Sequence, residues 1–260
     1  MRKKIIVRAP ALSRSGYGEH SRMILRSLRS NEDLFDIYLQ NIIWGNTCWI
    51  WEEDEERQWI DQLVLKTAQY VQHGGQFDVS MQVTIPNEWE RLAPINIGVT
   101  AGIETTKVSP HWIEKSQVVD HIITISEHSK NTYLNTSYQA QNNQTGEIID
   151  NFRCTTPIEV IHYPVKHIEP ANLDIEIDTD FNFLTVAQIS PRKNITNTIK
   201  WFVEEFIDQN VGLVVKVSTI NNSTSDRLQT VSSIESMLSE YENRKCKVYL
   251  LHGSMTEEEM

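Results

Sequence analysis

Two short segments place glycines or basic residues where α/β proteins bind phosphate. The first, residues 13–20 (SRSGYGEH), joins a predicted strand to a predicted helix. Gly16 and Gly18 would let the backbone turn tightly and approach a ligand, and the N–H groups that open a helix attract phosphate oxygens. Many strand–helix turns need glycine for geometry alone, and the third glycine of a dinucleotide fingerprint is absent. The segment therefore fits either a phosphate site or a purely structural turn.

The second segment, residues 187–194 (AQISPRKN), again follows a strand and opens a helix, with Asn194 as a predicted N-cap. Arg192 and Lys193 would lie where the positive end of the helix dipole reinforces them, which is an arrangement suited to a diphosphate. The alternative is an exposed, solvated basic pair. Position after a parallel strand favours the ligand site, because ligands of open α/β sheets bind there.

Two carboxylates, Glu88 and Glu104, each follow a predicted strand and could face one cleft. There they would accept hydrogen bonds from hydroxyls, act as a base or stabilise charge, although each could equally be a solvated loop residue. The histidines lack metal-ligand spacing, and the chain has no HExxH motif. It also has neither a GxSxG elbow nor a Walker motif, so serine hydrolases and P-loop phosphotransfer are disfavoured.

Predicted strands, which are short apolar runs, alternate along the chain with segments of helical periodicity, and these elements must position the candidate residues. Such alternation predicts βαβ units and a parallel sheet, so we expect an α/β fold. The predicted strands are residues 5–7, 35–43, 77–83, 95–99, 121–125, 158–161, 181–187, 211–217 and 247–251, and the predicted helices are 17–28, 52–71, 194–207 and 225–242. A proline-containing acidic stretch interrupts the series. We therefore expect two domains, 1–165 and 181–260, joined by a connection over 166–180.

Composition excludes several classes of protein. The net charge of −11 and a pI near 5.2 disfavour a broad nucleic-acid-binding surface, so any anion must be held locally. No run of about 18 apolar residues and no signal peptide is visible, so we expect a cytoplasmic chain without a transmembrane segment, which leaves peripheral membrane contact open. The three cysteines are far apart and outside any CxxC pattern, which argues against disulfides and structural zinc.

Four stretches, taken in order, resemble the retaining nucleotide-sugar glycosyltransferases of the GT-B fold, family 4 in particular. They are residues 15–20 (SGYGEH), 97–104 (IGVTAGIE), 112–130 (from the tryptophan through DHIITISEHSK) and 183–195 (FLTVAQISPRKNI). Because their order and spacing agree over nearly the whole chain, the resemblance is more specific than any one motif. It implies a complete N-terminal Rossmann-like acceptor domain and the first part of a second Rossmann-like domain, which holds the donor.

The resemblance also implies roles for individual residues. A nucleoside-diphosphate-sugar would be the donor substrate, a hydroxyl of a glycan, lipid or small molecule the acceptor, and no metal or other cofactor would be required. Charge stabilisation of the leaving diphosphate would be a main catalytic contribution. The residues that we expect are Glu104 in catalysis, Gly16, Gly18, Arg192 and Lys193 at the donor diphosphate, and His20, Glu88 and Ser126 at the substrates.

The chain departs from this family in two places. The usual Gly-Arg pair after the first donor-domain strand is Ala187-Gln188 here, and the family's Glu-x7-Glu motif does not occur before Met260. Residues 256–259 (TEEE) have capping-box spacing, which normally opens a helix. We therefore expect a truncated chain whose second sheet has an uncovered edge and which has little or no transfer activity by itself. A non-catalytic nucleotide- or glycan-binding module is the alternative, and a Rossmann oxidoreductase is disfavoured.

Overall fold

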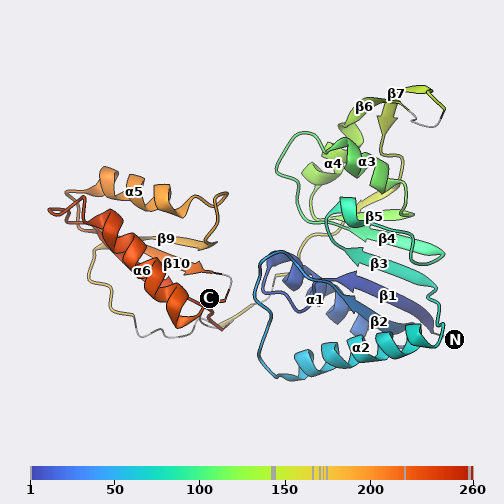
Figure 1. Cartoon of the computed structure of the whole chain (residues 1–260), viewed down its shortest axis with the longest axis horizontal. Helices are drawn as coiled ribbons and strands as arrows, with labels where there is room; N and C mark the ends of the chain where they lie inside the picture. The colour runs from blue at the N-terminus through green and yellow to red at the C-terminus, as the bar shows by residue number, and fades with distance from the viewer. Residues whose placement is uncertain are drawn as a thin grey trace. The chain divides into compact units, whose positions relative to one another are not determined.

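The chain forms two compact units, Met1–Val165 (unit 1) and Lys166–Met260 (unit 2). The computed structural model describes residues 2–141, 145–165, 167–169, 171, 173, 175–219, 221–256 and 259 (Figure 1). Parts of the predicted connection over 166–180, and Met260 itself, lie outside the described residues. Each unit is a parallel sheet with helices packed on it, so the chain has a mixed α/β, Rossmann-like architecture.

Unit 1 is built on a six-stranded parallel sheet in the order β2-β1-β3-β4-β5-β8. Its elements are β1 (Lys3–Ala9), α1 (Gly16–Arg29), β2 (Phe35–Asn41), α2 (Glu55–Gln72), β3 (Val79–Val83), the 3-10 helix η1 (Pro86–Glu88), β4 (Ile95–Val99), α3 (Pro110–Ser116), β5 (His121–Thr124), α4 (Glu127–Asn135), the antiparallel hairpin β6 (Ser137–Gln141) and β7 (Ile148–Arg153), and β8 (Ile158–Val160). The order reverses on either side of β1, which creates a topological switch point.

Helix α1 covers one face of this sheet near β1 and β2. Its Leu25 and Leu28 belong to the same buried core cluster as Ile5 and Val7 of β1. Alternating residues of a strand point to opposite faces, so this is the face that carries the odd-numbered residues of β1. Helix α2 protects the edge of the sheet, where the Leu39 amide of β2 donates to Thr67 Oγ1 at 2.7 Å. The exposed backbone of an edge strand is thereby partly satisfied.

The opposite face of the sheet is covered by η1, α3 and α4. Trp89, which follows η1, is fully buried and lies directly on Gly98 of β4, where an added Cβ would come within 2.6 Å of the indole. Ile113 of α3 and Tyr133 of α4 complete this second core cluster together with Ile122 of β5. Gly98 is therefore required by the packing of a large aromatic side chain against the sheet.

The observed elements differ from the sequence expectation mainly in the short helices. Helix α2 begins at Glu55 and not at residue 52, because the Asp54 side chain caps it by accepting from the Arg57 amide at 2.7 Å. Helices α3 and α4 and the hairpin β6–β7 were not expected. Helix α4 buries Ser129, Thr132 and Tyr133, so its buried face is polar and gives no apolar periodicity.

Unit 2 has a three-stranded parallel sheet in the order β11-β10-β9. Its elements are β9 (Phe181–Gln188), α5 (Ile195–Phe206), β10 (Val211–Ser218), α6 (Thr224–Leu238) and β11 (Lys247–His252). Both helices contribute to one core cluster, in which Val203 of α5 and Leu238 of α6 join Leu213 and Val215 of β10. Because these strand residues share one face, α5 and α6 cover the same side of the sheet.

Strand β9 forms an exposed edge of unit 2. Among the described residues it pairs with β10 alone, and Leu184 and Val186, on the face opposite α5, are 66% and 52% exposed.

Near the end of the chain, the two hydrogen bonds of the expected capping box are formed. The Thr256 amide donates to Glu259 Oε2 at 2.8 Å and the Glu259 amide donates to Thr256 Oγ1 at 3.3 Å, while residues 257 and 258 lie outside the described part of the chain.

Candidate functional site

Most of the predicted site residues of unit 1 follow the carboxyl ends of adjacent strands. The glycine turn follows β1, Glu88 ends the helix after β3, Glu104 lies in the segment after β4, and Ser126 follows β5. The sheet order places β1, β3, β4 and β5 side by side. Carboxyl ends of parallel strands meet at one edge of the sheet, and ligands of such sheets bind at that edge. The fold therefore gathers residues that are more than 100 positions apart in the sequence.

The two glycines of the turn have different surroundings. A Cβ on Gly18 would lie 1.9 Å from the Ser13 carbonyl oxygen, so the close approach of helix α1 to its own preceding loop requires glycine there. A Cβ on Gly16 would meet nothing within 4 Å. Ser15 caps the helix by accepting from the Gly18 amide at 3.1 Å. Gly18 is thus explained by internal packing, whereas Gly16 has space beside it for a ligand.

Tyr17, between the two glycines, was not singled out from the sequence but connects two of the candidate segments. Its hydroxyl lies 3.1 Å from Thr100 Oγ1 and accepts from the Ala101 amide at 3.2 Å. Its ring packs on Trp44, with centroids 4.4 Å apart. Burial raises the pKa of the Tyr17 phenol, so the group stays protonated and acts as a fixed hydrogen-bonding link. The only sequence signal was an aromatic residue inside a glycine turn.

Hydrogen bonds fix the backbone at and beside the two candidate carboxylates. The Glu88 carbonyl accepts from Arg8 Nη1 at 2.7 Å, and the Glu88 side chain is half-buried. The Glu104 side chain is exposed. Its flanking residues are fixed to α4, since the Ile103 amide donates to Ser129 Oγ at 2.9 Å and His128 Nε2 lies 3.1 Å from the Thr105 carbonyl oxygen. A carboxylate on this segment is therefore positioned at the edge of the sheet.

Ser126 has a structural role that its position alone did not reveal. Its hydroxyl caps α4 by accepting from the Ser129 amide at 3.1 Å, and it lies 2.9 Å from Ser129 Oγ. A hydroxyl has two acceptor lone pairs and one proton, so this cap uses only part of its capacity. Contact with a substrate stays a prediction for Ser126.

Buried threonine hydroxyls line the same edge of the sheet. Thr84 and Thr124, at the ends of β3 and β5, are fully buried, and their Oγ1 atoms have no hydrogen-bond partner among the described residues. Thr100 lies between them, because Val83 pairs with Val99 and Val99 pairs with Ile123. An unsatisfied buried hydroxyl costs stability, and because both threonines are fully buried, neither hydroxyl lies on a surface that a substrate contacts. Isolated threonines give no such signal in the sequence.

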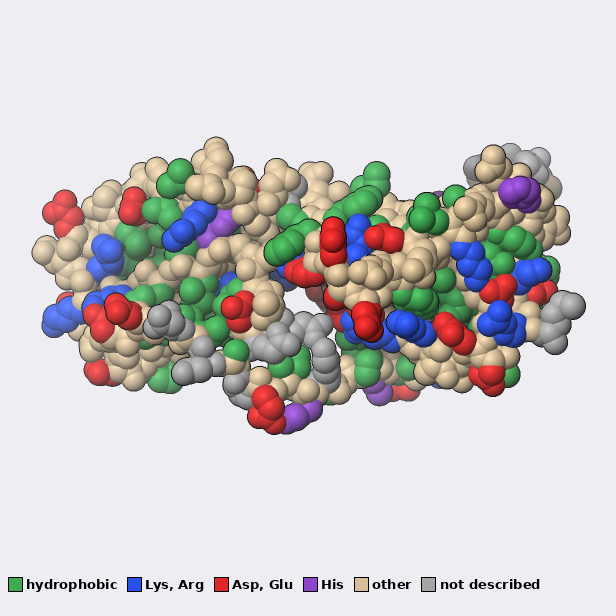
Figure 2. Space-filling model, turned by 90° about the horizontal axis from the view of Figure 1, so that it is seen from below, with side chains coloured by type: hydrophobic (Ala, Val, Ile, Leu, Met, Phe, Trp, Pro, Cys, Tyr) green, Lys and Arg blue, Asp and Glu red, His purple; other side chains and the backbone are tan. Residues whose placement is uncertain are grey.

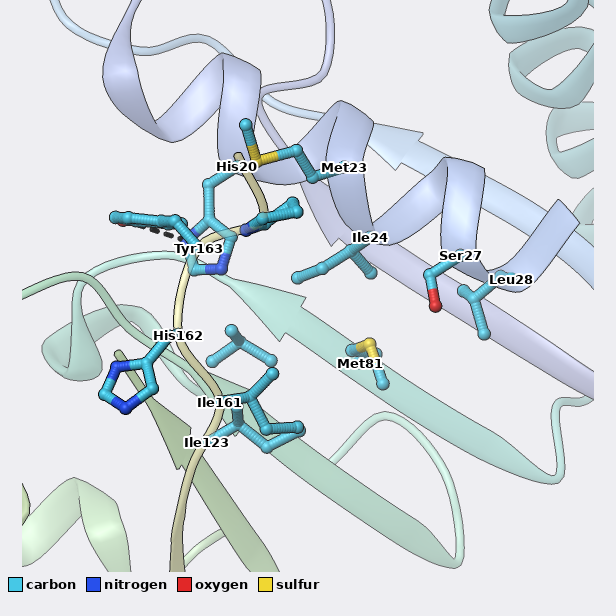
Figure 3. Close-up of a pocket in the computed structure, with 12 residues that line it drawn as sticks. His20, Met23, Ile24, Ser27, Leu28, Met81, Ile123, Ile161, His162 and Tyr163 are labelled. Atoms are coloured by element: carbon cyan, nitrogen blue, oxygen red, sulfur yellow. Dashed lines mark hydrogen bonds between the residues drawn. The ribbon is translucent and has the colours of Figure 1, made fainter. Parts of the chain in front are cut away.

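His20 lines an apolar cavity beside α1 (Figure 3). The residue is 7% exposed, and its Nδ1 lies 3.5 Å from the Tyr163 hydroxyl, with the two rings in an edge-on arrangement. Burial lowers the pKa of His20 to about 4, so the imidazole is neutral at pH 7. His20 is therefore suited to donate or accept one hydrogen bond and not to neutralise a phosphate.

The basic pair of unit 2 lies in the turn between β9 and α5. Arg192 and Lys193 are exposed, and the Lys193 amide donates to the Ser190 carbonyl at 3.1 Å. Asn194 is the N-cap residue in a left-handed conformation (φ 51°), and its side chain makes no capping bond. No acidic residue is present in the first turn of α5. The positive end of the helix dipole and the two cations therefore reinforce one another.

Within the described residues, no group of three or more His, Cys, Asp or Glu side chains could hold a metal ion. None of the helices that the structure describes is both long and apolar enough to cross a bilayer. On the face drawn in Figure 2, Lys and Arg side chains are scattered among Asp and Glu and do not gather in one basic patch.

Comparison with known proteins gives no family for this chain. No protein-family model and no curated protein sequence matches it. Among solved structures it is similar to the N-terminal domain of trehalose-6-phosphate phosphatase from Candida albicans, with a TM-score of 0.40 and 11% identity over 100% of this chain and 74% of that chain. A likeness this weak carries no conclusion about activity.

Proposed function

We propose that the chain is a nucleotide-sugar-dependent glycosyltransferase of the GT-B type, in which unit 1 serves the acceptor and unit 2 holds the donor diphosphate. One observation carries the proposal: two separate parallel-sheet units each carry their candidate residues after the carboxyl end of a strand, in a glycine turn in unit 1 and a basic turn in unit 2. That position is where open α/β sheets bind their ligands.

The chemistry would divide between the two turns as follows. Breaking the bond between sugar and diphosphate adds negative charge to the leaving group, and Lys193, with Arg192 and the N-terminus of α5, would stabilise that charge. In the glycine turn of unit 1, Gly18 is explained by its contact with Ser13, so Gly16 is the position where the backbone would admit a ligand. Glu104 would act as the base or charge stabiliser, and Glu88 would accept hydrogen bonds from substrate hydroxyls.

Calorimetric titration with UDP, GDP and ADP tests the donor site directly. Replacing Lys193 with alanine should weaken binding of the preferred nucleoside diphosphate by about 1.5 to 3 kcal/mol, the amount expected for a lost charged hydrogen bond. Lys200→Ala is the matched control, because Lys200 is an exposed lysine of α5 that lies 3.9 Å from Glu204.

The outcomes separate the candidate functions. Unchanged affinity in Lys193→Ala would remove this residue from the site, and no nucleotide binding by the parent chain would refute the donor role of unit 2. Transfer from any sugar nucleotide to an alcohol by the parent chain would exclude the non-catalytic binding module.

A further inference from the structure

Unit 1 contains an apolar cavity of about 370 Å³ between helix α1 and the sheet (Figure 3). Side chains of α1 form one wall, and residues of β3, β4 and β5 with the segment after β8 form the other. The register places Met81, Ile97 and Ile123 on the face that α1 covers, but α1 packs chiefly against β1, β2 and β3. The cavity is therefore the part of this sheet face that α1 leaves open.

The lining excludes most polar ligands. Aliphatic or thioether side chains and a proline make up eight of the twelve lining residues: Met23, Ile24, Leu28, Met81, Val99, Ile123, Ile161 and Pro164. The other four are His20, Ser27, His162 and Tyr163, so no lining residue carries a carboxylate, an ammonium or a guanidinium group. A phosphate or a free sugar would lose its hydration here without gaining enough partners. The lining suits a hydrocarbon group, and methionines adapt readily to its shape.

The length of the cavity indicates an elongated occupant. Its wall runs along α1 from His20 to Leu28, which is about 12 Å of helix at 1.5 Å per residue. A single extended alkyl chain has the shape and the apolar surface that this lining suits.

The two ends of the cavity differ in polarity. His20, Tyr163 and His162 lie at the end nearest the glycine turn, since His20 is four residues after Gly16 in the same helix. Ser27 and Leu28 lie at the far end, beside the last turn of α1. An amphiphile bound along α1 would therefore have its head group toward the edge of the sheet that carries Glu88 and Glu104.

We propose that this cavity binds the aliphatic chain of a single-chain amphiphilic acceptor, with the acceptor hydroxyl at the His20–Tyr163 end. The inference rests on the proposed function, which it deepens by naming the acceptor class as an amphiphilic alcohol. The hydroxyl would exchange hydrogen bonds with His20 or Tyr163, and the chain would replace water along Ile24, Met81 and Ile123.

Titration of the full chain with primary alcohols of increasing length tests the cavity without any nucleotide. From 1-butanol through 1-hexanol to 1-octanol, calorimetry should give saturable 1:1 binding whose affinity rises about fourfold per added methylene. Ser27→Trp fills the cavity from an exposed position of α1 and should lower the 1-octanol affinity at least tenfold. Ser232→Trp, the same change at an exposed position of α6 in unit 2, should leave that affinity within twofold.

Three results would overturn the inference. They are the absence of saturable octanol binding, an affinity that does not depend on chain length, and equal octanol binding by Ser27→Trp and the parent chain. Sedimentation would identify another occupant: a parent dimer that Ser27→Trp converts to a monomer would mean that a second copy covers this face. Octanol binding in a chain that binds no nucleotide would refute the donor site and the acceptor role together. Nucleotide binding without octanol binding would refute the cavity assignment alone.

Discussion

At the scale of single residues, environment decides which candidate side chains can perform the proposed chemistry. His20 was expected at the substrate, and it is held neutral by burial beside Tyr163. Gly18 and Ser126 have structural roles, in helix–loop packing and in capping α4. Gly16 and the exposed Glu104 keep accessible surroundings. Residue type and spacing could suggest all of these positions but could not separate structural from accessible ones.

His20 makes the stability of unit 1 depend on pH. Its pKa falls from 6.5 to about 4 on folding because burial disfavours the charged imidazolium. Between these pH values the unfolded chain binds a proton that the folded chain does not, so the free energy of unfolding decreases as the pH falls from 6.5 to 4. The stability that neutral His20 gives the folded chain is fully present above pH 6.5. The free energy of unfolding should fall by about 2–3 kcal/mol as the pH falls from 6.5 to 4.

Urea unfolding of the parent chain and His20→Asn at several pH values measures this contribution. The difference between the two free energies of unfolding should shrink as the pH falls toward 4. His73→Asn, at an exposed position that ends α2, controls for removal of a histidine from the surface. A difference that stays constant from pH 7 to pH 4 would show that His20 is not buried in its neutral form.

At the scale of elements, the approach of a helix to the loop before it sets the geometry of the candidate site. The Ser13 carbonyl occupies the space that a side chain at position 18 would need, and Ser13 Oγ lies 2.6 Å from Thr47 Oγ1, which connects the loop to the segment after β2. Tyr17 links the same turn to the segment after β4. The start of α1 is therefore fixed from two sides, as a preorganised site requires.

Alanine substitutions at the two glycines should have different effects on stability. Gly18→Ala forces a methyl group into a backbone carbonyl and should lower the free energy of unfolding by about 1–3 kcal/mol. Gly16→Ala meets no atom within 4 Å, and it should raise stability by about 0.4–1 kcal/mol by restricting the unfolded chain. Urea denaturation of both variants measures the difference. Similar values for the two substitutions would contradict the close contact between Gly18 and Ser13.

At the scale of the whole molecule, the buried cores are separate. Every residue of the two core clusters of unit 1 lies before residue 160, and every residue of the third cluster lies after residue 186. A core of its own is what allows a domain to fold by itself. The two units should therefore respond independently to changes in their interiors.

Scanning calorimetry should resolve two unfolding transitions. Leu25→Ala in unit 1 and Ile199→Ala in unit 2 remove fully buried side chains, and each should cost about 2–5 kcal/mol in its own unit. Each variant should lower one transition temperature and leave the other within about a degree of the parent value. A single transition that both substitutions lower would show that the units unfold as one cooperative body.

The sequence by itself predicted the α/β class, most of the strands and the long helices. These elements follow from the regular spacing of apolar residues, because a helix and a strand each bury side chains at a fixed interval along the chain. Helices α1 and α5 and the strands of both sheets show this spacing clearly. It also placed the glycine turn and the basic turn after strands. The polar helix α4 and the exposed strand β7 were missed, because neither buries an apolar stripe.

The tertiary structure alone decided what surrounds each candidate. The pairing of His20 with Tyr163 spans 143 positions, and the link from Tyr17 to Thr100 spans 83. The contact that requires glycine at position 18, the buried hydroxyls of Thr84 and Thr124, and the apolar cavity beside α1 likewise depend on how elements pack. Such environments arise from contacts between residues that are distant in the chain, and local sequence patterns carry no information about which of these will meet.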